Sequence, residues 1–66
     1  MPLIEQDLIL SSGSHLELPD LGILKVGAGS DLQLYHDGTD SWIENTNGDF
    51  YVVNNANGKD IIITCD

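Results

Sequence analysis

His36 is the residue of this 66-residue chain whose position is best suited to binding an ion. It is in phase with Leu32 and Leu34, so all three side chains would lie on one face of a strand. If that face points to a threefold axis, three copies of His36 could share a metal ion or an anion there. The favoured alternative is a turn-capping or water-bonded histidine beside Asp37.

The other reactive side chains form no catalytic pattern. His15 falls on the face opposite Leu16 and Leu18 and is expected to be exposed. Cys65 is the only cysteine, which excludes an intrachain disulfide, and we expect it to pack as a small apolar residue or to lie in a frayed end. No zinc-ligand spacing, Gly-x-Ser-x-Gly elbow, P-loop or His-Glu-x-x-His motif is present. We predict a protein that is not an enzyme and needs no cofactor.

A calcium loop of the EF-hand type is incomplete in this sequence. Asn45, Asn47 and Gly48 match its third, fifth and sixth positions, but Ile43 and Asn54 stand first and twelfth, where charged ligands are required. The match therefore fails.

A calcium-dependent β-roll is the first alternative class. Gly27, Gly29 and Asp31 fit three positions of its nonapeptide repeat. Val26 stands where the first glycine belongs, and Gln33 stands where the buried apolar residue belongs. Because the sequence contains only one imperfect copy of this repeat, a β-roll fragment is kept as an alternative.

A carbohydrate-binding module is a further alternative, because Trp42, Tyr35 and Tyr51 could offer flat apolar faces to sugars. The competing interpretation for Trp42 is packing, since the only tryptophan of a small protein usually belongs to its core or to a subunit interface.

The elements that must position these residues are very short strands. Apolar pairs split by one residue recur every eight residues in the first half of the chain, and the same apolar-x-apolar plan continues in the second half. Both members of a pair project from one face of a strand. The predicted structural core is Leu8, Leu10, Leu16, Leu18, Leu24, Val26, Leu32, Leu34, Phe50, Val52, Ile61 and Ile63.

Turn signals separate the strands. Asp37-Gly38, Asn47-Gly48 and Asn57-Gly58 follow one another at ten-residue spacing, and such dipeptides favour the positive φ of tight reversals. They fit a hairpin meander or the corners of a wound prism, and the constant eight-residue stride favours winding. We predict one all-β fibrous domain over residues 1-66, with a regular strand repeat in 1-34 and a turn-rich β segment in 35-66.

The small size of the chain points to self-association. A domain of about 60 residues buries only about 60% of the surface that its unfolded chain exposes and needs help from disulfides, metals or association. Three or more copies would supply the missing core.

The net charge of −9 argues against nucleic acid and anionic membrane surfaces as partners. The chain has no signal-peptide pattern and no apolar run of about 20 residues, so neither secretion by a signal peptide nor membrane insertion is expected.

The stretch DLQLYHDGTDSWIENTNGDFYV, residues 31-52, combines Tyr-His-Asp-Gly with a downstream Gly-Asp. It resembles the short repeat of structural and tail-fibre proteins of marine tailed phages, whose units read approximately apolar-x-Ile/Leu-Tyr-His-Asp-Gly, then Ser-x-Ile, then Gly-Asp-Leu-x-Ile. More loosely, the eight-residue stride is similar in architecture to the octads of trimeric β-helices in phage spikes, without their Val-x-Gly signature. The residues that match the fibre repeat are Leu32, Leu34, Tyr35, His36, Asp37, Gly38, Ser41, Ile43, Gly48, Asp49, Phe50 and Val52.

The resemblance implies an intertwined trimeric β-helix or β-prism that forms a segment of a bacteriophage tail fibre or spike. Such a segment would lie on the exterior of the virion and support host attachment. Its partners would be two further copies of itself, in a homotrimer, and other virion fibre components, with a host-surface glycan as a further candidate. A glycan-binding fibre tip is the alternative within this class.

Overall fold

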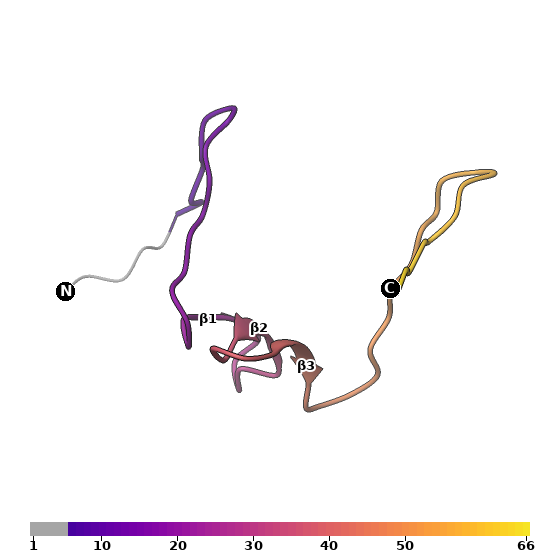
Figure 1. The fold of residues 1–66 in the computed structure, drawn as a ribbon. Coiled ribbons are helices and arrows are strands. Elements are labelled where there is room, and N and C mark those ends of the chain that lie inside the picture. Colours follow the sequence, from indigo (N-terminus) through magenta and orange to yellow (C-terminus); the bar gives the residue numbers. More distant parts are fainter. Residues whose placement is uncertain (1–5) are drawn as a thin grey trace.

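The computed structural model describes residues 6–66, and its regular structure is entirely β (Figure 1). Three strands, β1 (Ile23–Val26), β2 (Leu32–His36) and β3 (Ser41–Asn45), form one sheet in the order β1-β2-β3. Within the described part of the chain there is no helix, and hence none long and apolar enough to cross a membrane. The all-β prediction is confirmed.

Both strand pairs are antiparallel, so residues 23-45 form a meander. This is one of the two arrangements that the turn signals left open. The winding that the eight-residue stride favoured is not formed by these three strands, because each turn reverses the chain beside the strand it has just left. β-Branched and aromatic residues such as Ile23, Val26, Tyr35 and Ile43 suit the pleated surface of such a sheet.

The register divides the sheet into two chemically different faces. Leu24 pairs with Leu34, and Leu34 pairs with Ile43, so these side chains share a face, which also carries Val26 and Leu32 two residues along the strands. We call these five residues the leucine face. On the opposite face, the aromatic face, the two rungs are Ile23, Tyr35 and Trp42, and Lys25, Gln33 and Glu44.

Left-handed backbone recurs at the turns throughout the described chain. Glycines take positive φ at the Asp-Gly and Asn-Gly turns that the sequence predicts, with φ of 99° at Gly38, 78° at Gly48 and 69° at Gly58. Leu21 and Ser30, with φ of 66° and 56°, do the same without being glycines, which is an uncommon conformation for a residue with a Cβ. Every reversal of the chain is therefore fixed locally.

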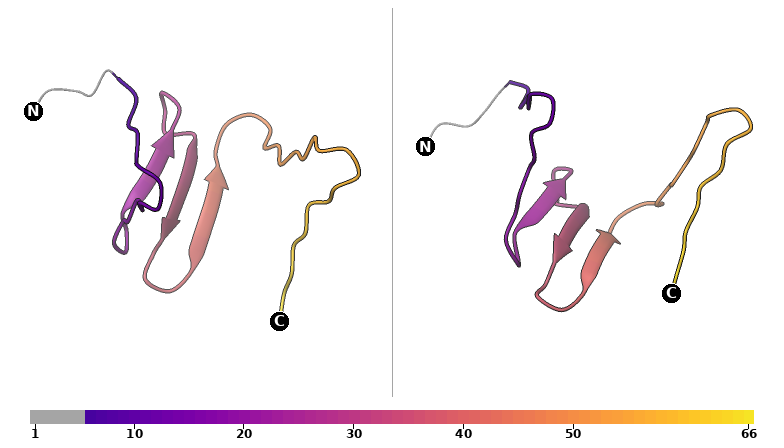
Figure 2. Two further views of the ribbon diagram at one scale, coloured as in Figure 1. Left: turned by 90° about the horizontal axis from the view of Figure 1, so that it is seen from above. Right: turned by 45° about the horizontal axis from the view of Figure 1, so that its top comes forward.

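Two arms extend from the sheet, residues 6-20 before β1 and residues 49-66 after β3. In Figure 1 both arms rise on the same side of the sheet, and Figure 2 shows the N-terminal arm next to β1 and the C-terminal arm beyond β3. Each arm contains a turn closed by one backbone hydrogen bond, from Ser14 N to Ser11 O (3.0 Å) and from Lys59 N to Ala56 O (3.2 Å). Apart from the bond between the Gly22 N–H and the Pro19 carbonyl oxygen, the legs on either side of these turns make no backbone–backbone hydrogen bond within residues 6–66.

The single chain has no buried core. No residue between 6 and 66 is buried, and the predicted core residues of the arms are among the most exposed, with 70% of Leu8 and 91% of Ile63 accessible. The chain exposes 6584 Å², whereas a compact protein of its mass exposes about 4,100 Å². Its radius of gyration is 15.4 Å, against about 11 Å for a compact domain of this length.

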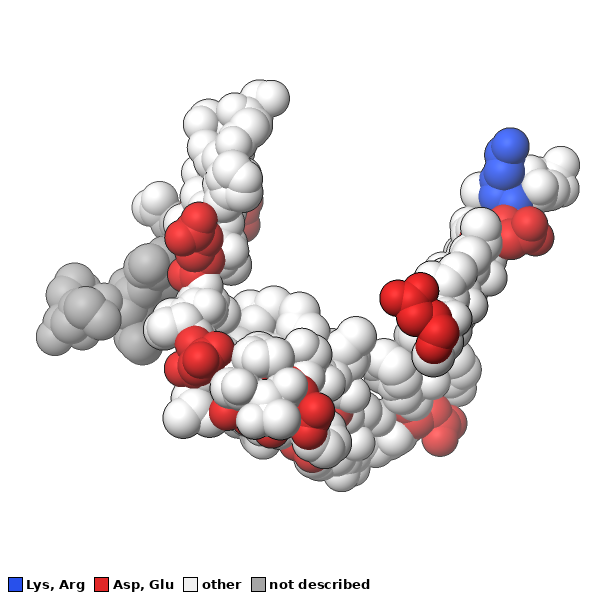
Figure 3. All heavy atoms as spheres, in the orientation of Figure 1, with Lys and Arg blue, Asp and Glu red and all other residues white. Residues whose placement is uncertain are grey.

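Acidic side chains are scattered over the sheet and both arms, as the space-filling view shows (Figure 3). With eleven carboxylates and two lysines in the sequence, attraction between opposite charges cannot hold the arms against the sheet.

Candidate functional site

The Tyr-His-Asp-Gly segment forms the β2–β3 turn, and Asp37 holds this turn together. One oxygen of its carboxylate, Oδ1, accepts hydrogen bonds from the backbone N–H groups of Thr39 (2.9 Å) and Asp40 (2.7 Å). The other oxygen, Oδ2, accepts from the indole Nε1–H of Trp42 at 2.9 Å. In addition, the Asp37 N–H donates to the Asp40 carbonyl oxygen at 2.9 Å. All three hydrogen bonds that the structure shows for this carboxylate connect it to residues 39-42, so they stabilise the turn.

These bonds favour the ionised carboxylate. The backbone N–H of Asp40 makes the largest contribution, followed by the Trp42 indole and the Thr39 N–H, and together they lower the pKa of Asp37 from 3.8 to about 2. The group stays exposed to solvent. A carboxyl with so low a pKa cannot act as a general acid near neutral pH, so the electrostatics of this turn fit a structural role.

Gly38 follows Asp37 because the backbone at this position has a φ of 99°, which side chains with a Cβ rarely adopt. The adjacent Asp20 carboxylate leaves space for a Cβ, since its nearest oxygen would lie 3.8 Å away. The glycine is therefore required by the backbone conformation and not by crowding.

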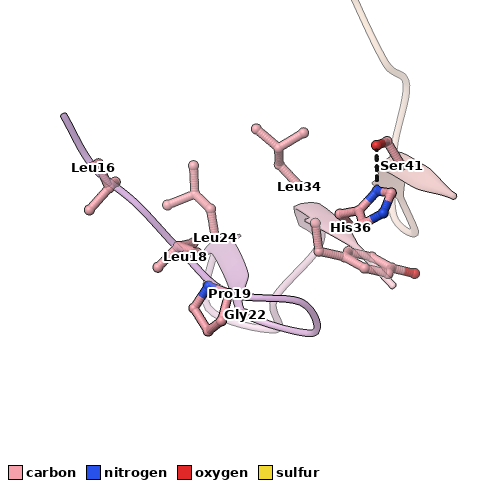
Figure 4. A pocket seen from close by; sticks show the side chains of 9 residues that line it. Leu16, Leu18, Pro19, Gly22, Leu24, Leu34, His36 and Ser41 are labelled. Carbon is pink, nitrogen blue, oxygen red and sulfur yellow. Dashed lines mark hydrogen bonds between the residues drawn. The ribbon is translucent and has the colours of Figure 1, made fainter. Parts of the chain in front are cut away.

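His36 lies on the leucine side of the sheet, at the rung it shares with Ser41. Its Nδ1 and the Ser41 hydroxyl are 2.8 Å apart, within hydrogen-bond distance (Figure 4). The serine of the fibre-like motif thus bonds to its histidine across the strand pair. The role of His36, as a turn-capping or water-bonded residue or as a ligand of an axial ion, stays a prediction.

Metal ligands do not converge in this structure. Among the described residues, no three side chains of His, Cys, Asp or Glu come close enough to hold a metal ion. His15 is exposed, as expected, and the Cys65 thiol is exposed near the C-terminal end with its Sγ 3.7 Å from the Asp66 carbonyl oxygen. An ion shared by three copies of His36 would need further chains and stays a prediction.

The aromatic residues of the motif pack against each other across the strand pair. The rings of Tyr35 and Trp42 have centroids 6.4 Å apart and an angle of 18° between their planes. Trp42 is 43% exposed, and its only ring N–H is already bonded to Asp37. Tyr51, the third aromatic residue of the carbohydrate alternative, lies in the C-terminal arm, outside this pair, with its hydroxyl 3.3 Å from an Asp49 carboxylate oxygen.

An open apolar groove lies between the N-terminal arm and the leucine face. Its volume is about 340 Å³, and Figure 4 shows Leu24 and Leu34 projecting from the sheet into the space beside Leu16. At its narrow end the chain turns tightly, because the Gly22 N–H bonds to the Pro19 carbonyl oxygen at 2.9 Å. The groove is lined by Leu16, Leu18, Pro19, Gly22, Leu24, Leu34, Tyr35, His36 and Ser41.

Sequence reasoning missed two parts of this arrangement. It assigned no task to the Asp37 carboxylate, although an aspartate immediately before the glycine of a tight turn is a known signal for side-chain to backbone bonding. It also assigned no task to Gln33, whereas the Gln33 amide donates to the Ser30 carbonyl oxygen at 3.0 Å and fixes the β1–β2 loop. Comparison of the chain with protein-family models, with curated proteins and with solved structures found no match.

Proposed function

We propose that this chain is a structural segment of a bacteriophage tail fibre or spike, which acts as an obligate homotrimer on the exterior of the virion and supports host attachment. The observation that carries the proposal is the absence of a buried core in residues 6–66. Hydrophobic residues make up 41% of the sequence, and none of those within residues 6–66 is buried. Association with other chains would bury them.

The size of the exposed surface fits this proposal. The chain exposes 6584 Å², about 2,500 Å² more than a compact protein of the same mass. Obligate interfaces bury about 2,000–5,000 Å² summed over both partners, or about 1,000–2,500 Å² on each, and resemble a domain core cut in half. The excess surface is therefore of the size that permanent association requires.

The backbone of the arms fits it as well. Apart from the Pro19 carbonyl oxygen, which accepts from the Gly22 N–H, their extended legs carry N–H and C=O groups that bond to no other backbone group in residues 6–66, and strand-like edges of this kind pair readily with another chain. In a wound trimer or prism, each leg would pair with a neighbouring copy and its apolar pairs would enter a shared axial core. The narrow width of such a core suits Leu, Ile and Val, which supply nearly all the apolar pairs.

The assignment to a phage fibre rests on the resemblance of residues 31-52 to fibre repeats. The structure gives that motif a physical meaning, because Asp37, Gly38 and Ser41 all serve one hairpin. A motif whose side chains stabilise a turn is suited to repetition along a shaft. Support of the appendage is the proposed role of this segment, with other virion fibre components at its ends.

Light scattering coupled to gel filtration tests the proposal. We expect a mass of about three times 7.2 kDa and no folded monomer at any concentration. A monomer that melts cooperatively would overturn the trimer and, with it, the structural role.

A calcium-dependent β-roll is tested by chelation. That class winds parallel strands around its calcium sites, whereas β1 and β2 are antiparallel on either side of residues 27-31. We expect excess EDTA to change neither the circular dichroism nor the melting temperature. A large loss of structure that calcium reverses would favour the β-roll, because metal binding and folding are coupled in such sites.

The glycan-binding tip is tested at Trp42. Because its indole bonds to Asp37 and its ring packs against Tyr35, we expect Trp42→Ala to lower the melting temperature and to leave any adhesion to host cells unchanged. Lost adhesion with unaltered melting would place Trp42 on a binding surface.

A further inference from the structure

We propose that the groove between the N-terminal arm and the leucine face receives Ile61–Ile63 of a second copy of this chain. The inference rests on the homotrimer proposed above and specifies how one copy holds the next. It follows from the shape of the groove, from the exposure of the isoleucines and from the path of the C-terminal arm.

The groove is suited to an apolar strand and not to a polar ligand. None of its lining residues carries a formal charge, and most of its wall is aliphatic, with Leu16 and Leu18 on one side and Leu24 and Leu34 on the other. Its polar side chains include His36 and Ser41, which already bond to each other. Pockets for small polar molecules need several convergent polar groups, and few are left here.

Ile61–Ile63 is an exposed apolar segment of the described chain that such a groove could cover. The three isoleucines are 49%, 79% and 91% exposed, and no charged residue interrupts residues 61-64. An exposed run of β-branched residues with unpaired backbone groups is an aggregation hazard unless something covers it. A native partner surface removes that hazard.

The spacing of side chains along the isoleucine segment matches the spacing of the leucines on one wall of the groove. On a strand, side chains two residues apart lie on the same face, about 6.6 Å from each other. Ile61 and Ile63 have this spacing, and so do Leu16 and Leu18 on one wall of the groove. One face of the isoleucine leg can therefore match the leucines of the wall, with Ile62 directed away.

The path of the chain favours a second copy over the chain's own arm. Most of the groove lining comes from residues 16-24 and from β2, with Ser41 of β3 at its border, whereas the C-terminal arm leaves the sheet after β3, the edge strand opposite β1 (Figure 2). The arm then keeps its turn over residues 54-60, where Asn54 Nδ2 donates to the Asp60 carbonyl oxygen at 2.9 Å and Asn54 Oδ1 accepts from the Ala56 N–H at 3.0 Å. The C-terminal arm therefore stands beyond β3, whereas the N-terminal arm that forms one wall of the groove stands next to β1, at the other edge of the sheet (Figure 2).

The contact joins two different surfaces, an arm and a groove, so it is head-to-tail. Contacts of this type close into a ring when the rotation between copies allows it and otherwise continue as filaments. Three copies related by a threefold axis would each give one arm and receive one. All three grooves would then be filled and no Ile61–Ile63 segment would remain exposed.

Photo-crosslinking of the full-length chain tests the inference. A benzophenone amino acid replaces Ile63 in one preparation and Ile62, as the matched control, in another. Each is refolded together with an equal amount of isotope-labelled unmodified chain, irradiated and digested. We expect position 63 to crosslink to peptides containing Leu16, Leu18, Leu24 or Leu34 of the labelled copy, and position 62 to give at least fivefold less of these products.

The outcomes separate this inference from the proposed function. Crosslinks from position 63 that stay within one chain would overturn it, as would crosslinks to other segments of the labelled copy, and in the latter case a trimeric mass would still stand. A monomeric mass by light scattering would remove both proposals.

The variant pair Ile63→Asp and Ile62→Asp gives a second readout, the apparent molecular mass. A carboxylate at position 63 would enter the apolar groove and should convert the assembly to smaller species. The same change at position 62 should leave the mass unaltered, and equal effects of the two changes would contradict the inference.

Discussion

At the scale of single residues, the part of the sequence with the most recognisable motif is also the part whose side chains make the most specific contacts. Asp37 accepts three hydrogen bonds, His36 lies within hydrogen-bond distance of Ser41, and Trp42 bonds back to Asp37. These contacts all lie within one hairpin. The motif therefore encodes a turn that can form before any other chain is present.

Acid should open this turn. The pKa of Asp37 is lowered from 3.8 to about 2 in the folded state, so its contribution to stability is complete above about pH 4 and is lost as the pH falls through 2. Trp42, the only tryptophan, reports on the event because its indole bonds to the titrating carboxylate. We expect its fluorescence to change between pH 4 and pH 2.

Asp37→Asn should abolish this fluorescence transition and lower the melting temperature at pH 7, because an amide keeps one neutral acceptor oxygen and puts an NH2 donor in place of the other carboxylate oxygen, so it cannot accept from all three donors. Asp40→Asn is the matched control, because the Asp40 backbone, and not its carboxylate, takes part in the turn. An unchanged transition in Asp37→Asn would show that another group is responsible.

At the scale of elements, the test concerns which face of β2 enters the core of the assembly. Leu34 is 48% exposed in the single chain, so truncation to alanine would cost little if the chain stayed alone. In a trimer whose core includes the leucine face, Leu34→Ala should cost about 2 to 5 kcal/mol per chain, as for other buried leucines. Thermal or denaturant unfolding of the assembled protein measures this cost.

The control for Leu34→Ala is Lys25→Ala, which lies on the aromatic face and should leave unfolding nearly unchanged. Gln33→Ala is a less suitable control because it removes the hydrogen bond to the Ser30 carbonyl oxygen, at a cost of about 1 kcal/mol. Equal destabilisation by Leu34→Ala and Lys25→Ala would show that the leucine face is not the one that becomes buried.

The sequence allowed the class of the fold and the division into two faces to be predicted, for a local reason. Alternation of apolar residues fixes which side chains share a face, as with Leu32 and Leu34, and the Asp37-Gly38 and Asn47-Gly48 dipeptides fix the reversals. Winding could not be separated from a meander in this way, since both use the same turns. What distinguishes them is pairing between segments far apart or between chains, and no local pattern records it.

The same reasoning explains the parts of the site that escaped prediction. The groove depends on where residues 16-19 lie relative to β1 and β2, and the positive φ of Leu21 that helps to place them has no signature in a leucine. The task of Gln33 depends likewise on the path of a five-residue loop, residues 27-31. Contacts set by one residue type at one turn were predictable, and contacts set by the course of a loop were not.

At the scale of the whole molecule, apolar association works against charge repulsion. One chain carries a net charge of −9, so a trimer carries a net charge of 3 × −9 = −27. Two lysines per chain are too few to neutralise the carboxylates. Association should therefore strengthen as salt screens the repulsion, in contrast to assemblies held by ion pairs between chains.

The screening length sets the range of salt in which this effect should appear. It is about 30 Å at 0.01 M ionic strength and about 10 Å at 0.1 M, while the chain measures 45 × 29 × 28 Å. At the lower ionic strength the charges of one copy act across the whole width of its neighbours, and at the higher only those near the contact surfaces do. Sedimentation velocity at dilute protein should show the trimer fraction rising between 0.01 M and 0.3 M NaCl.

The double variant Asp7→Asn and Asp66→Asn is the control for that rise, because it removes two exposed charges far from the sheet without touching a predicted contact. It should associate more strongly than the natural chain at 0.01 M NaCl and respond less to added salt. A trimer fraction that falls with salt would mean that Lys25 or Lys59 forms ion pairs between chains which outweigh the general repulsion. The assembly would then depend on specific charge contacts, and the apolar faces alone could not account for it.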